Sequence, residues 1–269
     1  MTRKFLTEQI KEKKSYLCVG LDTDIDLIPL HLKTTSDPVF EFNKQIIDVT
    51  ADLCVAYKIN TAFYEARGAK GWESMQKTVD YISSAHFKIA DAKRGDVGHT
   101  SAQYAKAFFD TMNFDALTIA PYMGEDSVRP FLEYEDKWTI LLGLTSNKGA
   151  SDFELQKVKD EYLFEKVIKA ASVWGTPQNL MFVIGATQSD QLKRARRSAP
   201  EHFFLVPGIG TQGGSLADVS KNTMTVDFGL LVNISRAIIY ASLNEDFTDI
   251  ARLVALKYQQ QMARIIDQN

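Results

Sequence analysis

Short apolar runs recur along the chain, and most of them are separated by segments with a helical pattern. The run at residues 16–21 reads YLCVGL, and the run at 139–145 reads TILLGLT. Because nearly every position in these runs is apolar, they predict strands that are buried on both faces, as in a parallel sheet. The eight predicted strands are residues 16–21, 53–60, 86–92, 116–120, 139–145, 180–187, 203–209 and 230–236.

Helical patterns fill the segments between these strands, with apolar residues repeating at helix spacing. The predicted helices are an amphipathic one at 1–15 and others at 40–53, 72–84, 101–112, 163–175 and 248–267. Eight strands alternating with helices in about 250 residues predict an α/β fold of the (β/α)8 or TIM barrel type. A doubly wound open sheet is the alternative, since strand count does not separate the two. No Pro-, Gly- or Ser-rich linker divides the chain, so we expect residues 1–269 to form a single barrel domain with an N-terminal helix.

Composition narrows the classes of function. The net charge of −3 provides no basic surface for nucleic acid. No apolar run reaches the roughly 18 residues of a membrane span, and the amphipathic N-terminal segment is unlike a secretory signal. We therefore expect a cytoplasmic protein that binds neither nucleic acid nor membrane. The dense basic run at 193–197 has the pattern of a solvated helix face, with an anion-binding patch as the alternative.

Cysteines and histidines give no sign of a metal site. Cys18 and Cys54 lie in apolar runs and form no CxxC pair, which predicts buried free thiols in a reducing compartment. The four histidines are scattered without the spacing of zinc ligands. We expect no metal.

Polar residues gather where the predicted strands end. Lys58 and Asn60 close the second strand two positions apart, and Asp91 and Lys93 close the third in the same way, so each pair shares one strand face. Other polar residues follow other strands: Asp22, Ser146 and Arg236. The active site of a (β/α)8 barrel lies at these carboxyl ends. Any one residue could simply reach solvent there, but lysines and aspartates within the strand period favour a site.

A glycine-rich segment follows the seventh strand. Residues 206–214 read VPGIGTQGG, in which three glycines match GxGxxG: Gly208, Gly210 and Gly213. The match to a dinucleotide fingerprint is weak, because the segment lies in the seventh unit and no ribose-binding acid follows a second strand. In a barrel, the loops after strands seven and eight commonly bind phosphate. Backbone amides, Gln212 and Arg236 would then converge on one phosphate group, which predicts a phosphorylated substrate. A flexible turn is the alternative.

The charged cluster after the third strand resembles a known family. Asp91-Ala-Lys93-Arg-Gly-Asp96, with Thr100 four positions further on, resembles the DxKxxD motif of the orotidine 5′-phosphate decarboxylases. The motif alone is shared with related barrels that act on keto-sugar phosphates. Over almost the whole chain, however, the resemblance continues, and two further segments resemble the longer, bacterial type 2 branch: YKINTAFYE at 57–65 and PYMGEDS at 121–127.

The resemblance implies a cofactor-independent carboxy-lyase that converts orotidine 5′-monophosphate to uridine 5′-monophosphate in de novo pyrimidine biosynthesis. Its implied catalytic residues are Lys93, Asp91, Asp96 and Lys58, with Lys93 protonating the carbanion at ring carbon 6. The implied substrate contacts are the ribose for Asp22 and Lys58, the pyrimidine for Ser146, the phosphate for Gln212 and Arg236, and the substrate or the charge array for Asn60. Asp96 and Thr100 would come from the partner subunit, which implies a homodimer. One departure from the family is Ser235, where many members have glycine.

The residue types suit this chemistry. Loss of carbon dioxide leaves a carbanion in the ring plane, so the protein must lower the barrier by positioning and electrostatics. In an alternating row Lys58, Asp91, Lys93, Asp96, the carboxylates would keep Lys93 charged until it gives up its proton. Three rivals remain. They are a metal-dependent keto-sugar phosphate decarboxylase or synthase, a Schiff-base aldolase using Lys93 or Lys58, and a silent barrel that only binds a nucleotide.

Overall fold

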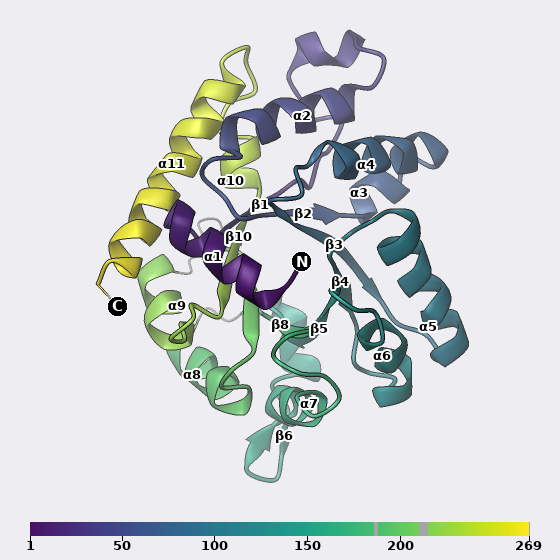
Figure 1. The fold of residues 1–269 in the computed structure, drawn as a ribbon, viewed down its shortest axis with the longest axis vertical. Helices are drawn as coiled ribbons and strands as arrows, with labels where there is room; N and C mark the ends of the chain where they lie inside the picture. Colours follow the sequence, from purple (N-terminus) through teal and green to yellow (C-terminus); the bar gives the residue numbers. More distant parts are fainter. Residues whose placement is uncertain (186–187, 210–214, 269) are drawn as a thin grey trace.

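A computed structural model describes residues 1–185, 188–209 and 215–268, and eight parallel strands close into a barrel within them (Figure 1). Around the barrel the strand order is β1-β10-β9-β8-β5-β4-β3-β2. β1 pairs with both β10 and β2, which closes the sheet. The predicted (β/α)8 barrel is therefore confirmed, and the open sheet is excluded.

The elements follow the predicted order. The barrel strands are β1 (Leu17–Gly20), β2 (Ala56–Asn60), β3 (Phe87–Arg94), β4 (Ala116–Ile119), β5 (Trp138–Leu144), β8 (Leu180–Ile184), β9 (Phe203–Pro207) and β10 (Leu230–Ile234). The α-helices are α1 (Arg3–Lys13), α2 (Pro38–Thr50), α3 (Ala62–Glu65), α4 (Ala69–Tyr81), α5 (Gly98–Ala105), α6 (Glu125–Leu132), α7 (Leu163–Ala171), α8 (Ser189–Ser198), α9 (Leu216–Thr223), α10 (Arg236–Ile239) and α11 (Phe247–Ile266). Shorter elements are the 3₁₀ turns η1 (Leu30–Thr34) and η3 (Lys148–Asp152), the π-helical turn η2 (Lys106–Thr111), and the small hairpin of β6 (Lys157–Val158) and β7 (Glu161–Tyr162).

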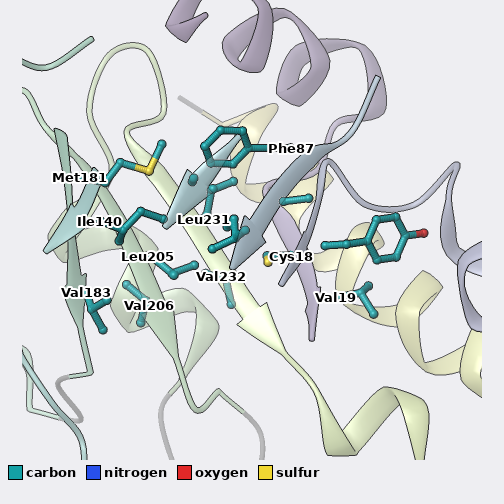
Figure 2. Close-up of a cluster of buried hydrophobic side chains, with 14 of the residues drawn as sticks. Cys18, Val19, Phe87, Ile140, Met181, Val183, Leu205, Val206, Leu231 and Val232 are labelled. Carbon is teal, nitrogen blue, oxygen red and sulfur yellow. The ribbon is translucent and has the colours of Figure 1, made fainter. Parts of the chain in front are cut away.

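The core joins the barrel interior to the layer between strands and helices. Side chains from several strands gather in it, among them Ile140 of β5, Leu205 of β9 and Leu231 of β10 (Figure 2). Such burial removes about 25 cal/mol of unfavourable hydration per Å² of apolar surface, which explains why the strand sequences are apolar almost throughout. The two cysteines, Cys18 and Cys54, are free and buried in the same core, as predicted.

Helix α1 covers the end of the barrel where the strands begin (Figure 1). Arg3 donates hydrogen bonds to the carbonyls of Pro177 and Glu201 and to the carboxylate of Asp227, which precede β8, β9 and β10 respectively. These contacts tie three strand entrances to one side chain. The open end of the barrel is consequently the opposite one, where the strands finish.

Two of the four basic residues in the run on α8 make contacts within the chain. Arg194 pairs with Asp190 and Glu165, and Arg196 donates to four backbone carbonyls while lying over the ring of Phe204. Lys193 and Arg197 are exposed, as predicted for a solvated helix face, whereas Arg194 and Arg196 are engaged within the chain.

Candidate active site

Four side chains of alternating charge form a row at the carboxyl ends of the first three strands. The Nζ of Lys58 lies 3.0 Å from Asp22 Oδ1 and 3.0 Å from Asp91 Oδ2. The Nζ of Lys93 lies 2.6 Å from the other oxygen of Asp91, Oδ1. The observed row is therefore Asp22, Lys58, Asp91, Lys93, and the sequence had not placed Asp22 in it.

The two lysines of the row differ in their exposure to solvent. The side chain of Lys58 is 4% exposed, whereas that of Lys93 is 49% exposed. Burial disfavours the charge on Lys58, but Asp22 and Asp91 outweigh burial and hold its pKa above the usual value for lysine. Lys58 is thus a fixed internal cation, and Lys93 is the ammonium group that a ligand can reach.

Asp91 stays ionised although it is mostly buried. Burial raises the pKa of a carboxyl group, but here Lys58 and Lys93 outweigh that effect and hold the pKa of Asp91 well below its usual value. The hydroxyl of Thr118 also donates to Asp91 Oδ1, at 3.0 Å. The negative charge of Asp91 therefore lies directly beside the ammonium group of Lys93.

A backbone irregularity in β3 directs Lys93. The pairing of β3 with β4 shifts between Ala90 and Arg94, so that more residues of β3 than of β4 span the same stretch. Lys93 has a φ of 50°, a left-handed conformation that non-glycine residues seldom adopt. Bulges of this kind commonly turn a side chain toward an active site. The bulge explains how the side chains of Asp91 and Lys93 come into contact, although positions i and i+2 of a regular strand would be about 6–7 Å apart.

The segment that carries Asp22 is held by a tyrosine from the far end of the chain. The hydroxyl of Tyr240 accepts a hydrogen bond from the backbone N–H of Asp24 at 2.6 Å and donates to the carbonyl of Asp22 at 3.2 Å. Burial raises the pKa of Tyr240 to about 12, so the hydroxyl keeps its proton. Its ring stacks on Phe42 of α2.

A cavity of about 150 Å³ connects the charged row to the predicted phosphate-binding segments. Its lining combines Asp22, Lys58 and Asp91 with Gly208, Ser235 and Arg236. Gly208 has a φ of 90°, which favours glycine at this position. The other predicted phosphate-loop residues, Gly210, Gln212 and Gly213, lie outside the described residues. An anionic group in this cavity would have an arginine at one end and the charged row at the other.

The remaining predicted site residues lie around the same end of the barrel. Asn60 ends β2, and its side chain accepts a hydrogen bond from the backbone N–H of Ala62 at the start of α3. Ser146 is exposed directly after β5. Asp96 and Thr100 lie after β3 and in α5, and the carboxylate of Asp96 accepts from the backbone N–H of Val97 rather than pairing with Lys58 or Lys93.

Comparison with known proteins decides the family. The sequence profile described as "Orotidine 5′-phosphate decarboxylase / HUMPS family" matches residues 15–246, most of the chain. The chain belongs to this family.

Relatives of this decarboxylase-family chain are similar to it over nearly their whole length. The orotidine 5′-phosphate decarboxylase of Flavobacterium johnsoniae is 57% identical, with 99% of each chain covered. That of Bacteroides fragilis is 55% identical, over 98% of this chain and 97% of the relative. Among solved structures, the OMP decarboxylase of Leishmania donovani is 35% identical with a TM-score of 0.85, and 98% of each chain is covered. The resemblance inferred from the sequence is confirmed.

Two polar residues of this family member's site were missed in the sequence. Thr118 is the polar residue of an otherwise apolar strand, ALTI in β4, and that exception was the available signal. Asn233 of β10 lines the cavity although it is buried, and it too interrupts an apolar strand. Both are buried polar groups, which need partners in the folded state and therefore deserve notice in a sequence.

No group of three or more His, Cys, Asp or Glu side chains in the part of the chain that the structure describes is arranged to hold a metal ion. No helix in the described ranges has the length and apolar character to cross a membrane.

Proposed function

We propose that this chain converts orotidine 5′-monophosphate to uridine 5′-monophosphate and carbon dioxide, a step of de novo pyrimidine biosynthesis, without a metal or a cofactor. Membership of the family and the names of relatives that are more than half identical support the substrate. The observation that carries the chemistry is the row Asp22, Lys58, Asp91, Lys93, because it presents one accessible ammonium group beside a buried anion.

The reaction breaks the bond between ring carbon 6 and the substrate carboxylate. Carbon dioxide departs, and the bonding electron pair stays on carbon 6 in the ring plane. The ammonium group of Lys93 stabilises this charge as it develops and then transfers a proton to carbon 6, giving the product. The neutral amine of Lys93 regains a proton from solvent, to which it is half exposed.

Asp91 and Lys58 act as a fixed electrostatic frame for Lys93. Lys58 neutralises one oxygen of Asp91, and the other oxygen faces Lys93. The raised pKa of Lys58 also opposes the Schiff-base rival, since a nucleophilic lysine needs a depressed pKa. Asp22 forms an ion pair with Lys58. In this proposal Asp22 also contacts the ribose, Asn60 contacts the substrate or the charge array, and Ser146 contacts the pyrimidine.

Remote binding energy must supply part of the acceleration. A charge pair at 4 Å is worth about 4 kcal/mol at an effective dielectric constant of 20, whereas demanding reactions need roughly 20 kcal/mol. The phosphate is bound by Arg236, Gln212 and the glycine loop that begins at Gly208. This binding aligns the ring with Lys93. The cavity lining includes Arg236 and three residues of the row, which supports a role for phosphate binding beside the role of the row in the chemical step.

The active unit is a homodimer in which Asp96 and Thr100 complete the site of the partner subunit. Within one chain Asp96 forms no ion pair with the row, although it lies only three residues from Lys93. Large apolar side chains are exposed around it, namely Val97 next to Asp96 and Tyr122 and Met123 in the loop before α6. A second copy that covered this surface would bury them and bring its own Asp96 toward Lys93.

The activity is tested by mixing the purified protein with orotidine 5′-monophosphate in the presence of a metal chelator and following the ultraviolet change. Turnover is expected in the wild type and is expected to be lost in Lys93→Met. Chelator-sensitive turnover would favour the metal-dependent rival. Unchanged turnover in Lys93→Met would rule out Lys93 as the acid.

The shared site is tested by mixing two inactive variants, Lys93→Met and Asp96→Asn. Each mixed dimer would carry one doubly altered site and one intact site, so random mixing restores about a quarter of the wild-type sites. Activity that stays at the level of the separate variants, while exchange of subunits is demonstrated by a tagged copy, would contradict a site built from two chains.

A further inference from the structure

The hydroxyl of Thr118 touches both members of the Asp91–Lys93 pair. Thr118 lies in β4 and is fully buried, next to the bulged part of β3. Its Oγ1 accepts a hydrogen bond from the backbone N–H of Lys93 at 3.0 Å and donates one to Asp91 Oδ1 at 3.0 Å. One side chain on a neighbouring strand therefore fixes the backbone of the proposed acid and the carboxylate of its partner.

The direction of these bonds is determined by chemistry. A backbone N–H can only donate and an ionised carboxylate can only accept, so the single hydroxyl proton of Thr118 must point to Asp91. The result is a chain from the Lys93 N–H through the hydroxyl to Asp91 Oδ1, which also accepts from the Nζ of Lys93. Both ends of Lys93 are thereby tied to one carboxylate oxygen.

The bulge in β3 makes the hydrogen bonds of Thr118 to Lys93 and Asp91 necessary. Because the β3–β4 pairing shifts between Ala90 and Arg94, the N–H of Lys93 bonds to a side chain rather than to the neighbouring strand's backbone. The left-handed φ of 50° at Lys93 is costly for a residue with a side chain and persists only where surrounding contacts enforce it. Thr118 supplies such a contact from the rigid interior of the barrel.

We infer that Thr118 is a positioning residue, which sets the distance and orientation between Lys93 and Asp91 without touching the substrate. Thr118 is fully buried and is absent from the cavity lining, so it acts through these two residues. The inference rests on the proposed function for its effect on turnover. Its effect on the geometry of the unliganded protein is independent of that function.

A substitution series separates the hydroxyl from the packing. Thr118→Val keeps the shape and removes both hydrogen bonds, and Thr118→Ser keeps the hydroxyl and removes a methyl group. The matched control is Thr139→Val on the next strand, β5. Thr139 is also fully buried, and its hydroxyl has no hydrogen-bond partner among the described residues. The same chemical change is therefore made at a buried threonine that lacks the two hydrogen bonds of Thr118.

The expected result is a loss of kcat in Thr118→Val with little change in KM, because ground-state contacts to the substrate are intact. The loss should be about tenfold to hundredfold, the size expected for a hydrogen bond to a charged group. Thr118→Ser should keep most of the wild-type kcat, and Thr139→Val should keep all of it. A kcat in Thr118→Val within twofold of the wild type, or an equal loss in Thr118→Ser, would overturn the inference.

A crystal structure of unliganded Thr118→Val provides the second readout. We expect the φ of Lys93 to leave the left-handed region and its Nζ to separate from Asp91. An unchanged Lys93 backbone would overturn the inference even if turnover fell. If the wild type failed to decarboxylate orotidine 5′-monophosphate, the proposed function would be wrong, and this structural comparison would still decide the role of Thr118.

Discussion

Gly20 and Ser235 share one small volume between adjacent strands. A methyl group added at Gly20 of β1 would lie 2.6 Å from the Cβ of Ser235, just after β10, and 3.0 Å from the side-chain oxygen of Asn233. The side-chain oxygen of Ser235 is itself buried and has no hydrogen-bond partner among the described residues. Ser235, the residue before Arg236, thus occupies the space that the glycine of β1 leaves open.

This relationship predicts a compensating pair of substitutions. Gly20→Ala should destabilise the protein by about 1–3 kcal/mol, because overpacking of a core forces neighbouring atoms apart. Ser235→Gly alone should cost less, and in its presence Gly20→Ala should cost clearly less than in the wild type, with the contact to Asn233 remaining. Urea unfolding of the two single variants and the double variant measures the coupling. Strict additivity of the three free energies would show that the two positions do not compete for space.

Replacement of the two lysines of the row should destabilise the protein to different extents. Lys58→Met should reduce the free energy of unfolding by about 3–5 kcal/mol, because it leaves Asp22 and Asp91 without their buried counter-ion. Lys93→Met should change it by only about 1 kcal/mol or less, since that side chain is half exposed. Denaturant titration at pH 7 compares them. A Lys93 variant that is the less stable of the two would contradict the assignment of Lys58 as the structural cation.

Arg236 should contribute to the chemical step although it lies at the other end of the cavity. Arg236→Ala is expected to lower kcat/KM by about tenfold to hundredfold, through the loss of charged hydrogen bonds to the phosphate. Steady-state kinetics with orotidine 5′-monophosphate provide the measurement. The control is Arg197→Ala, an exposed arginine on α8. A normal kcat/KM in the Arg236 variant would remove phosphate binding from the proposed mechanism.

His202 should limit the stability of the protein in acid. Burial, with Arg3 and Arg196 nearby, lowers the pKa of His202 to about 4, and neither ring nitrogen has a partner among the described residues. The neutral form is favoured in the folded state, so its contribution is intact above pH 6.5 and is lost as the pH falls toward 4. By pH 4.5 the loss should be about 2–3 kcal/mol.

The variant His202→Leu isolates this effect. Its free energy of unfolding should depend less steeply on pH between 6.5 and 4.5 than that of the wild type, as measured by urea titration at both values. Parallel curves for the wild type and the His202 variant would show that another group is responsible.

The architecture was predictable because apolar periodicity records burial directly. All eight strands were expected from their apolar sequences, and the parity of Lys58 with Asn60 and of Asp91 with Lys93 indicated shared faces at the right end of the barrel. Local sequence was sufficient at these points, since strand geometry alone decides which side chains lie together.

Contacts that depend on register between distant segments were not predictable. The sequence does not show that β3 bulges against β4, and without the bulge Thr118 has no visible connection to Lys93. Asp22 was expected near the ribose, but its bond to Lys58 depends on how a loop after β1 is held by Tyr240, more than 200 residues away. Asp96 was expected to serve a neighbouring copy, and that prediction awaits the mixing experiment.

Because α1 covers the end of the barrel where the strands begin, ligand entry and product release are affected. With that end covered and the interior filled by side chains, the cavity lined by Arg236 and Lys58 reaches the charged row from the opposite end of the barrel. Under the proposed reaction, entry of the substrate and release of both products would therefore take place at this one end of the barrel.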